Sequence, residues 1–316
     1  MDTKHSSLSI DGMLLHWAEC GASSDSNPVP VLLLHGLHDS HLTWRRIAPL
    51  LAAGGRRVLM PDLMGCGLSA RPDASYALHW HAGLIARWLR ELGIKKVDVV
   101  GHSFGGGVAQ MLLLEPAPPR VRRLALVASG GLGPHVGVWL RLATFPGVVE
   151  SFGQPFMGAA TRLALWRARG FVSQEDIEQL SEMNSGDGSA RAFARTIADV
   201  INLRGQSKCF FQRAHQVRRL PVMKLFWGDH DDVTPIQDAR AFVRSVQNVH
   251  LVRFPGAGHY VHHEKAEELA SELQAFLDAP ALPRARLAKA RREQPLWAQR
   301  WASFLDLLMP DMSARA

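Results

Sequence analysis

The sequence predicts an α/β protein: a mostly parallel β-sheet flanked by helices, with a helical segment inserted between two strands. Short apolar runs alternate along the chain with segments of helical periodicity, which is typical of a parallel sheet covered on both faces. An interval of about 90 residues separates two consecutive strand candidates, far more than a crossover helix needs. We therefore expect one large core interrupted by an insertion.

Six short apolar runs are the strand candidates, because they are aliphatic, brief and bounded by loop residues. They cover residues 29–34, 57–61, 96–100, 124–128, 222–227 and 249–254. Residues 8–17, broken by Asp11-Gly12, predict an antiparallel hairpin at the sheet edge. Apolar residues at steps of three and four predict helices over 76–92 and 266–277.

The same patterns predict the domain organisation. Residues 1–131 and 220–279 should form the core, and residues 132–219 a helical lid above the sheet. Pro280 and Pro283 mark the start of a basic, helical C-terminal extension, residues 280–316. Its apolar stripe consists of Trp297, Trp301, Phe304, Leu305 and Leu308. We expect a helix that packs back on the core, or one that docks to a second subunit or an anionic membrane surface.

Composition narrows the class of protein. Hydrophobic residues make up 47% and charged residues 21%, as in ordinary folded proteins, and no run of about 18 apolar residues predicts a transmembrane helix. The first residues lack a signal-peptide pattern, so a cytoplasmic location is expected. The net charge of +7 is concentrated in the extension, where seven Lys and Arg face three acidic residues. Without an aromatic and basic stripe elsewhere, no nucleic acid is expected as a partner.

The strongest chemical signal is the pentapeptide Gly101-His102-Ser103-Phe104-Gly105. It follows a strand candidate and precedes the helical residues 108–114, which is the context of a nucleophile elbow. Glycines at 101 and 105 would remove side chains that clash in this tight turn. The hydroxyl of Ser103 should therefore be exposed at the carboxyl edge of the sheet.

A serine nucleophile needs a base, and the base needs an orienting acid. The strand candidate 222–227 is followed by Asp229, Asp231 and Asp232, and the candidate 249–254 is followed by His259. Loops at the carboxyl ends of parallel strands meet at one edge, where ligands bind in open α/β sheets. Spacing alone leaves the three aspartates as rivals. Further histidines, at 262, 263, 35, 38 and 41, are interpreted as surface or supporting residues.

Five ordered motifs make the chain resemble the α/β-hydrolase family, especially its lid-bearing serine esterases, C–C hydrolases and haloperoxidase-like enzymes. The motifs are L-L-H-G (33–36), D-x-x-G-x-G-x-S-x-x-P (62–72), G-H-S-x-G-G (101–106), W-G-x-x-D-x-x-x-P (227–235) and G-x-G-H (256–259). The resemblance covers residues 8–279 and implies the α/β-hydrolase fold. It implies Ser103 as nucleophile, Asp231 as acid and His259 as base. The backbone N–H groups of Leu37 and Phe104 would form the oxyanion hole, and no cofactor or metal is expected.

The resemblance implies a serine hydrolase that cleaves carboxylic esters of small or medium apolar acyl compounds. Ser103 argues against haloalkane dehalogenase and epoxide hydrolase chemistry, which use Asp at the elbow. The alternatives are a C–C bond hydrolase acting on vinylogous diketone acids, indicated by residues 129–133, and a perhydrolase. Two further classes are a metallohydrolase built on His259, His262 and His263, and a non-catalytic binding protein. A small-molecule substrate is the expected partner, with homo-oligomer or surface contacts through the extension. The acyl pocket is expected among the aromatic residues Trp44, Trp139, Phe145, Phe152, Phe156 and Trp166, each of which could equally be core.

Overall fold

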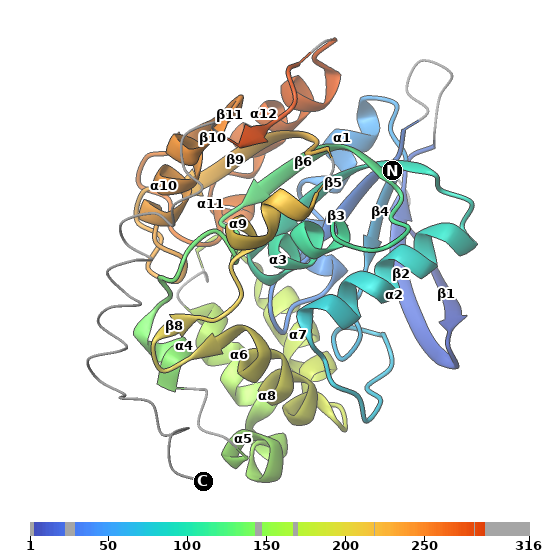
Figure 1. The fold of residues 1–316 in the computed structure, drawn as a ribbon. Helices are drawn as coiled ribbons and strands as arrows, with labels where there is room; N and C mark the ends of the chain where they lie inside the picture. The colour runs from blue at the N-terminus through green and yellow to red at the C-terminus, as the bar shows by residue number, and fades with distance from the viewer. Residues whose placement is uncertain are drawn as a thin grey trace, which may run out of the picture.

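A computed structural model describes residues 3–22, 29–142, 147–166, 170–217, 219–280 and 282–287. Its main sheet has eight strands in the order β1-β2-β4-β3-β5-β6-β9-β11 (Figure 1). β1 and β2 pair antiparallel, as do β2 and β4, and all other neighbours are parallel. The mostly parallel sheet is confirmed, and all six predicted strands overlap observed ones. The strands are β1 (Lys4–Ile10), β2 (Met13–Cys20), β3 (Val31–Leu34), β4 (Val58–Pro61), β5 (Lys96–His102), β6 (Arg120–Val127), β9 (Val222–Gly228) and β11 (Val249–Phe254).

The predicted edge hairpin is formed by β1 and β2. Its turn consists of Asp11 and Gly12, whose φ angles of 50° and 78° are both positive. Two-residue hairpin turns favour this conformation because its twist matches that of the strands, and Asp-Gly adopts it at low cost. Ile10 therefore pairs directly with Met13.

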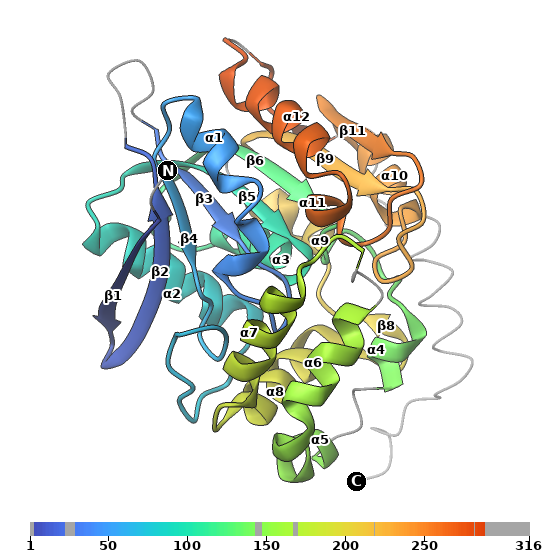
Figure 2. The same cartoon turned by 180° about the vertical axis from the view of Figure 1, so that it is seen from behind.

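Helices cover both faces of the sheet, as the two opposite views show (Figures 1 and 2). On one face lie α2 (Leu78–Glu91), α3 (Ser103–Leu112), α9 (Phe210–Arg213) and α10 (Gln237–Ser245). On the other lie α1 (Ala48–Ala53), α11 (Val261–Glu264) and α12 (Ala266–Asp278). The two strongest helix predictions coincide with α2 and α12, whereas α3 begins at Ser103, five residues before the predicted start.

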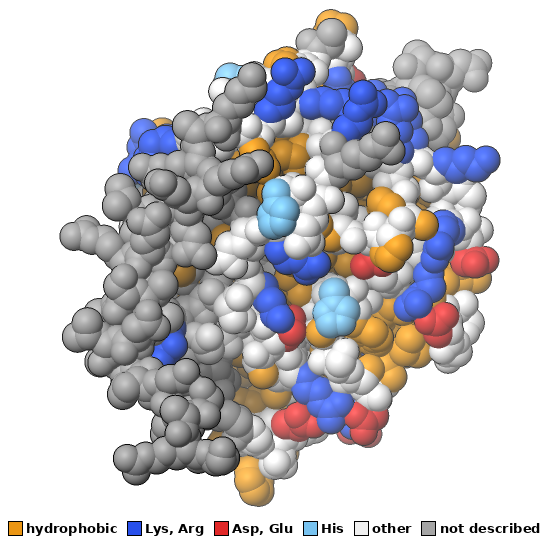
Figure 3. All heavy atoms as spheres, in the orientation of Figure 1, with side chains coloured by type: hydrophobic (Ala, Val, Ile, Leu, Met, Phe, Trp, Pro, Cys, Tyr) orange, Lys and Arg blue, Asp and Glu red, His pale blue; other side chains and the backbone are white. Residues whose placement is uncertain are grey.

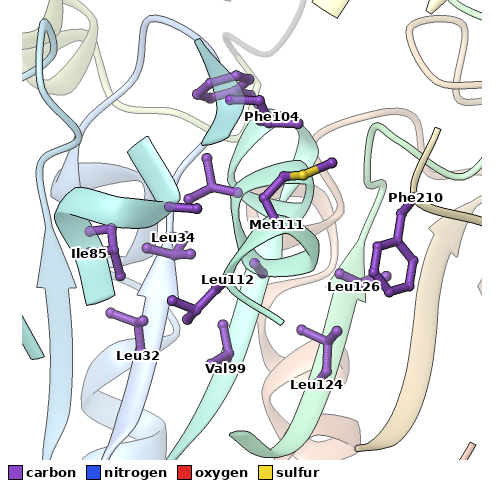
Figure 4. Close-up of a cluster of buried hydrophobic side chains, with 14 of the residues drawn as sticks. Leu32, Leu34, Ile85, Val99, Phe104, Met111, Leu112, Leu124, Leu126 and Phe210 are labelled. Carbon is purple, nitrogen blue, oxygen red and sulfur yellow. The ribbon is translucent and has the colours of Figure 1, made fainter. Parts of the chain in front are cut away.

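The two hydrophobic cores are separated by the sheet because successive strand residues point to opposite faces. Leu32 and Leu34 of β3 pack toward α2 and α3, while Val31 and Leu33 pack toward α1 and α12. Figure 4 shows side chains of β3, β5 and β6 gathered against α3, with Phe104 at one end of the cluster. The core thus fixes the start of α3, where Ser103 lies.

The long interval between β6 and β9 is mainly helical and gathers at one end of the sheet (Figure 2). Asn184 Nδ2 donates to the carbonyl of His38, 2.7 Å away, so the insertion contacts the loop that follows β3. Its elements are α4 (Val138–Leu142), α5 (Val148–Phe152), η2 (Gln154–Phe156), α6 (Met157–Trp166), α7 (Gln174–Ser185), α8 (Ser189–Val200), the short strands β7 (Ile201–Asn202) and β8 (Gly205–Gln206), α9 and η3 (Ala214–Gln216).

After α12 the chain returns to the core. β12 (Arg286–Leu287) pairs antiparallel with β10 (Val246–Gln247), and Ala285 N donates to Pro221 O at 3.0 Å. The apolar stripe and most basic residues predicted for the extension lie outside the described residues.

Within the described ranges, every helix is too short or too polar to cross a bilayer. On the face in Figure 3, Lys and Arg side chains gather toward the top of the view, and several lower down lie beside Asp or Glu.

Candidate active site

The predicted site residues lie at the carboxyl ends of four strands. Ser103 follows β5, Leu37 follows β3, Asp231 follows β9 and His259 follows β11. The chain runs from β3 to β4 on one side and then to β5 on the other, so β3 and β5 flank a switch point in strand order. Open α/β sheets bind ligands in the crevice that forms at such a point.

Ser103 occupies a strained turn between β5 and α3. Its φ of 51° lies in the left-handed region, which is unfavourable for a non-glycine residue and is often found at functional positions. The flanking glycines allow this turn. A Cβ at Gly101 would lie 2.6 Å from Gly105 O, and one at Gly105 would lie 2.4 Å from Leu34 O. The close approach predicted from the sequence is therefore present at both glycines.

Asp231 and His259 form a buried pair. Nδ1 of His259 lies 3.0 Å from Oδ2 of Asp231 and 3.1 Å from Oδ1. The carboxylate also accepts hydrogen bonds from the backbone N–H groups of Val233 and Thr234 at 2.9 and 2.8 Å. Thr234 Oγ1 lies 2.9 Å from Oδ2. The acid is thus fixed by its own loop, and it in turn fixes the imidazole.

The rival aspartates are placed differently. Asp229 forms a two-pronged ion pair with Arg253, with both N–O distances 2.8 Å, and hydrogen bonds from Arg253 lower the pKa of Asp229. The side chain of Asp232 is exposed. Of the three candidates, only Asp231 is brought to His259 by the described contacts.

The neighbouring histidines are buried beneath the turn. His262 Nε2 lies 2.7 Å from Thr43 Oγ1, and the rings of His262 and His102 are 4.2 Å apart. Burial lowers the pKa of both side chains well below the usual range, and that of His263 to about 4. These imidazoles are therefore neutral supports at physiological pH.

Two backbone N–H groups beside Ser103 are available as donors. Neither the N–H of Leu37 nor that of Phe104 donates to another group in the described part of the chain. The loop that carries Leu37 is braced by His35, whose Nε2 accepts from Leu63 N at 2.9 Å and whose Nδ1 lies 2.8 Å from Gly36 O. Preorganised donors of this kind stabilise an oxyanion.

A narrow cavity of about 60 Å³ opens beside Ser103. Core and insertion both contribute to its mostly apolar wall, which includes Leu78, Gly131, Val136, Leu140 and Ile201. One charged side chain, Lys208, also lines the cavity.

The prediction that aromatic residues form the acyl pocket is wrong for those that the structure describes. Trp44 is fully buried in the core, and its ring lies 5.4 Å from that of His262. Trp139, Phe152, Phe156 and Trp166 are 55–75% exposed, on helix faces turned away from the cavity. Phe145 lies outside the described residues. The cavity beside Ser103 is lined mostly by aliphatic side chains. Periodicity alone did not show which face of each helix points toward it.

Two glutamines that the sequence did not single out organise the cavity wall. Gln206 Oε1 accepts from Gly131 N at 2.7 Å, and Gln110 Nε2 donates to Ser129 Oγ and Gly130 O at 2.9 and 2.8 Å. Gly130 N donates to the Ser103 carbonyl at 3.0 Å. No motif marks either glutamine, whereas Thr234 could have been found inside the W-G-x-x-D-x-x-x-P motif.

Cys66 is unsuited to act as a nucleophile. Burial raises the pKa of its thiol to about 12, so the thiolate is scarce at neutral pH. It lies in a turn whose glycines, Gly65 and Gly67, have positive φ angles.

Comparison with known proteins agrees with this architecture. The family model described as alpha/beta hydrolase fold matches residues 29–266. An uncharacterised protein of Mycobacterium tuberculosis is 31% identical over 259 residues, covering 78% of this chain and 75% of that protein. A 2-hydroxymuconate semialdehyde hydrolase of Pseudomonas sp. is 29% identical over 262 residues, covering 80% of this chain and 89% of its own. A solved epoxide hydrolase superposes with a TM-score of 0.70 at 25% identity, covering 88% of this chain and 99% of that structure.

The fold and the matched family define a hydrolase of the α/β class. The chain belongs to the α/β-hydrolase fold family, as its motifs predict. Its relatives include a 2-hydroxymuconate semialdehyde hydrolase and a soluble epoxide hydrolase.

Proposed function

We propose that this chain is a serine hydrolase that cleaves carboxylic esters of small or medium apolar acyl compounds through an acyl-enzyme on Ser103. The observation that carries the proposal is the buried Asp231–His259 pair, at the same sheet edge as the strained Ser103. The apolar cavity beside Ser103 supports an ester with an apolar acyl part.

In this mechanism Ser103 Oγ attacks the ester carbonyl, and its proton passes to Nε2 of His259. Asp231 fixes the productive tautomer through Nδ1 and stabilises the imidazolium that forms. The N–H groups of Leu37 and Phe104 donate to the oxyanion. The imidazolium then protonates the departing alcohol, which leaves the acyl-enzyme. A water molecule, deprotonated by His259, releases the acid and restores Ser103.

Residues 132–219 would act as the lid in this scheme, because Val136, Leu140 and Ile201 close the apolar side of the cavity. The core would comprise residues 1–131 and 220–279. We assign no chemical role to the extension, residues 280–316, because the proposed catalytic groups all precede residue 260. Arg286 and Leu287 of this extension nevertheless pair with β10, so a truncation should begin after Leu287.

A second candidate is hydrolysis of a carbon–carbon bond in a vinylogous diketone acid. Lys208 favours it, since this cationic side chain lines an otherwise mostly apolar cavity and could bind a substrate carboxylate. The 29% sequence identity to a 2-hydroxymuconate semialdehyde hydrolase supports the same candidate. Epoxide hydrolysis is disfavoured because serine occupies the elbow.

The two candidates are separated by a series of p-nitrophenyl esters, from acetate to decanoate, assayed beside a vinylogous diketone acid. We expect the highest kcat/KM for short acyl chains and little cleavage of the diketone acid. Cleavage of the diketone acid alone would establish the second candidate. Turnover of neither substrate class, by folded protein, would indicate a non-catalytic binding protein.

A further inference from the structure

A cluster of three histidines and one aspartate lies away from the proposed catalytic residues. The His/Asp cluster consists of His5 on β1, His16 on β2, His41 in η1 (His41–Trp44) and Asp62 after β4. Asp62 is fully buried, His16 and His41 are each 5% exposed, and His5 is exposed. The three imidazole centroids are 5.1–5.3 Å apart. The proposed reaction uses none of these side chains.

Two of the imidazoles turn the same ring nitrogen toward one carboxylate. His16 Nδ1 lies 2.8 Å from Asp62 Oδ2, and His41 Nδ1 lies 2.9 Å from Asp62 Oδ1. Ligand atoms of the three residues all lie within 4.8 Å of one another. In tetrahedral coordination, Zn²⁺ lies about 2.0–2.1 Å from each ligand atom, so two ligand atoms are about 3.3 Å apart. Each N–O distance would therefore widen by about 0.5 Å to admit an ion.

His5 completes the arrangement on the outer side. Its Nδ1 lies 3.2 Å from Nε2 of His16. If Nδ1 of His16 were bound to an ion, its Nε2 would carry the proton and donate it to His5. Metal-bound histidines commonly donate their second N–H to such an outer partner, which orients the ring. His5 is also the exposed member of the cluster, so an ion could enter beside it.

From this geometry we infer that the His/Asp cluster is a binding site for a divalent first-row transition-metal ion such as Zn²⁺. His16, His41 and Asp62 would be the ligands, and His5 the outer partner. Two imidazoles and one carboxylate suit Zn²⁺, Fe²⁺, Ni²⁺ or Cu²⁺ better than Mg²⁺ or Ca²⁺. Three protein ligands leave one position for water.

The bound ion would connect the edge hairpin to the loops around the candidate active site. His41 N already donates to Asp62 Oδ1 at 2.7 Å. The backbone N–H of Leu63, the residue after Asp62, donates to His35 Nε2. An ion at Asp62 would therefore stabilise the hairpin against the loop that carries Leu37. The bound ion would stabilise the fold, and the inference does not depend on the proposed ester hydrolysis.

The test uses the full chain without a histidine tag, stripped of metal by a chelator. Zn²⁺ is titrated by calorimetry, and Co²⁺ by its visible absorption, which reports imidazole coordination. We expect one equivalent to bind with micromolar affinity or tighter. His16→Gln and His41→Gln should each weaken binding at least tenfold, whereas His250→Gln, at an exposed position on β11, should not change it.

His5→Ala gives a second readout at an exposed position, where folding is least at risk. It should weaken Zn²⁺ binding by about tenfold, as loss of an outer partner does. In the unsubstituted protein, one equivalent of Zn²⁺ should raise Tm by several degrees, and EDTA should reverse the rise. Three results would overturn the inference: no stoichiometric binding, unchanged binding in the His16 and His41 variants, or a Co²⁺ spectrum that persists in them. The last would place the ion elsewhere, such as at Asp39, His102 and His262.

Discussion

Oδ2 of Asp231 lies 3.0 Å from Nδ1 of His259, and both side chains are buried at the sheet edge that carries Ser103. Two backbone N–H groups and the Thr234 side chain also bind the carboxylate. This arrangement gives Asp231 the features expected of the acid of a triad: it is fixed in place and contacts only one nitrogen of the imidazole.

Asp231→Asn should lower kcat for p-nitrophenyl acetate by about 10³–10⁴-fold, because an amide favours the wrong imidazole tautomer. Asp229→Asn is the matched control, since Asp229 pairs with the exposed Arg253. It should stay within about threefold of the unsubstituted enzyme. Steady-state kinetics of the two variants decide the assignment, and a larger loss at Asp229 would show that the acid is placed wrongly.

Thr234→Val should lower kcat by about tenfold with little change in KM, because a hydrogen bond to a charged group is worth about 1.5–3 kcal/mol. Its Oγ1 lies 2.9 Å from Asp231 Oδ2 and 3.0 Å from Ala128 O. Thr161→Val, a buried threonine of the insertion that binds Met157 O, should leave kcat unchanged. Equal effects of the two substitutions would remove Thr234 from the account.

Ile201→Ala should widen the cavity and so favour longer acyl chains. The ratio of kcat/KM for p-nitrophenyl octanoate to that for the acetate should rise about tenfold, because one methylene in an apolar pocket changes the preference between substrates on this scale. Ile201 is buried and lines the cavity, whereas Leu203, two residues on, is 66% exposed. Leu203→Ala should therefore leave the ratio unchanged. An unaltered ratio in folded Ile201→Ala protein would argue against the insertion as a determinant of acyl specificity.

His81→Met should reduce the loss of stability in acid. Both ring nitrogens of His81 are buried and have no hydrogen-bond partner among the described residues, and burial lowers its pKa to about 3. In the unfolded chain the imidazole of His81 binds a proton near pH 6.5, whereas in the folded chain it does so only near pH 3. The free energy of unfolding therefore keeps its full value above pH 6.5 and decreases as the pH falls toward about 3. Between pH 7 and pH 5 the contribution is about 2 kcal/mol.

Urea unfolding at the two pH values measures this effect. The unfolding free energy of the Met variant should fall less between pH 7 and pH 5, and that of His79→Met, an exposed position on the same helix, should fall as in the unsubstituted protein. Equal pH dependence in all three proteins would mean that His81 is protonated in the folded state.

Six strands of the main sheet were predictable because each contains a short apolar run that ends at a loop signal. The Asp11-Gly12 turn and the glycines around Ser103 were also predictable, since the backbone conformations they adopt are nearly specific to such residues. The α8 helix lies inside the insertion that was predicted to be helical. The α10 helix was not among the predicted helices, although it is amphipathic, with Ala239 and Phe242 buried and Arg240 and Arg244 exposed.

Residues brought together only by the fold could not be predicted from the sequence. Trp139, Phe152, Phe156 and Trp166 are exposed, and the sequence did not predict this because helix periodicity does not show which neighbour a helix face contacts. Gln206 contacts the Ser129-Gly130-Gly131 segment across 75 residues of chain, and no local pattern marks that contact. The His/Asp cluster likewise joins positions 5, 16, 41 and 62 from separate elements.

The central claim is that Ser103 is an activated nucleophile, and covalent labelling tests it most directly. A fluorophosphonate probe should modify the native protein at one site, located at Ser103 by mass spectrometry of its peptides. Ser103→Ala should lose both labelling and ester turnover, the latter by several orders of magnitude. Labelling at another residue, or a Ser103→Ala protein that keeps more than about a tenth of the ester hydrolysis rate, would contradict the account.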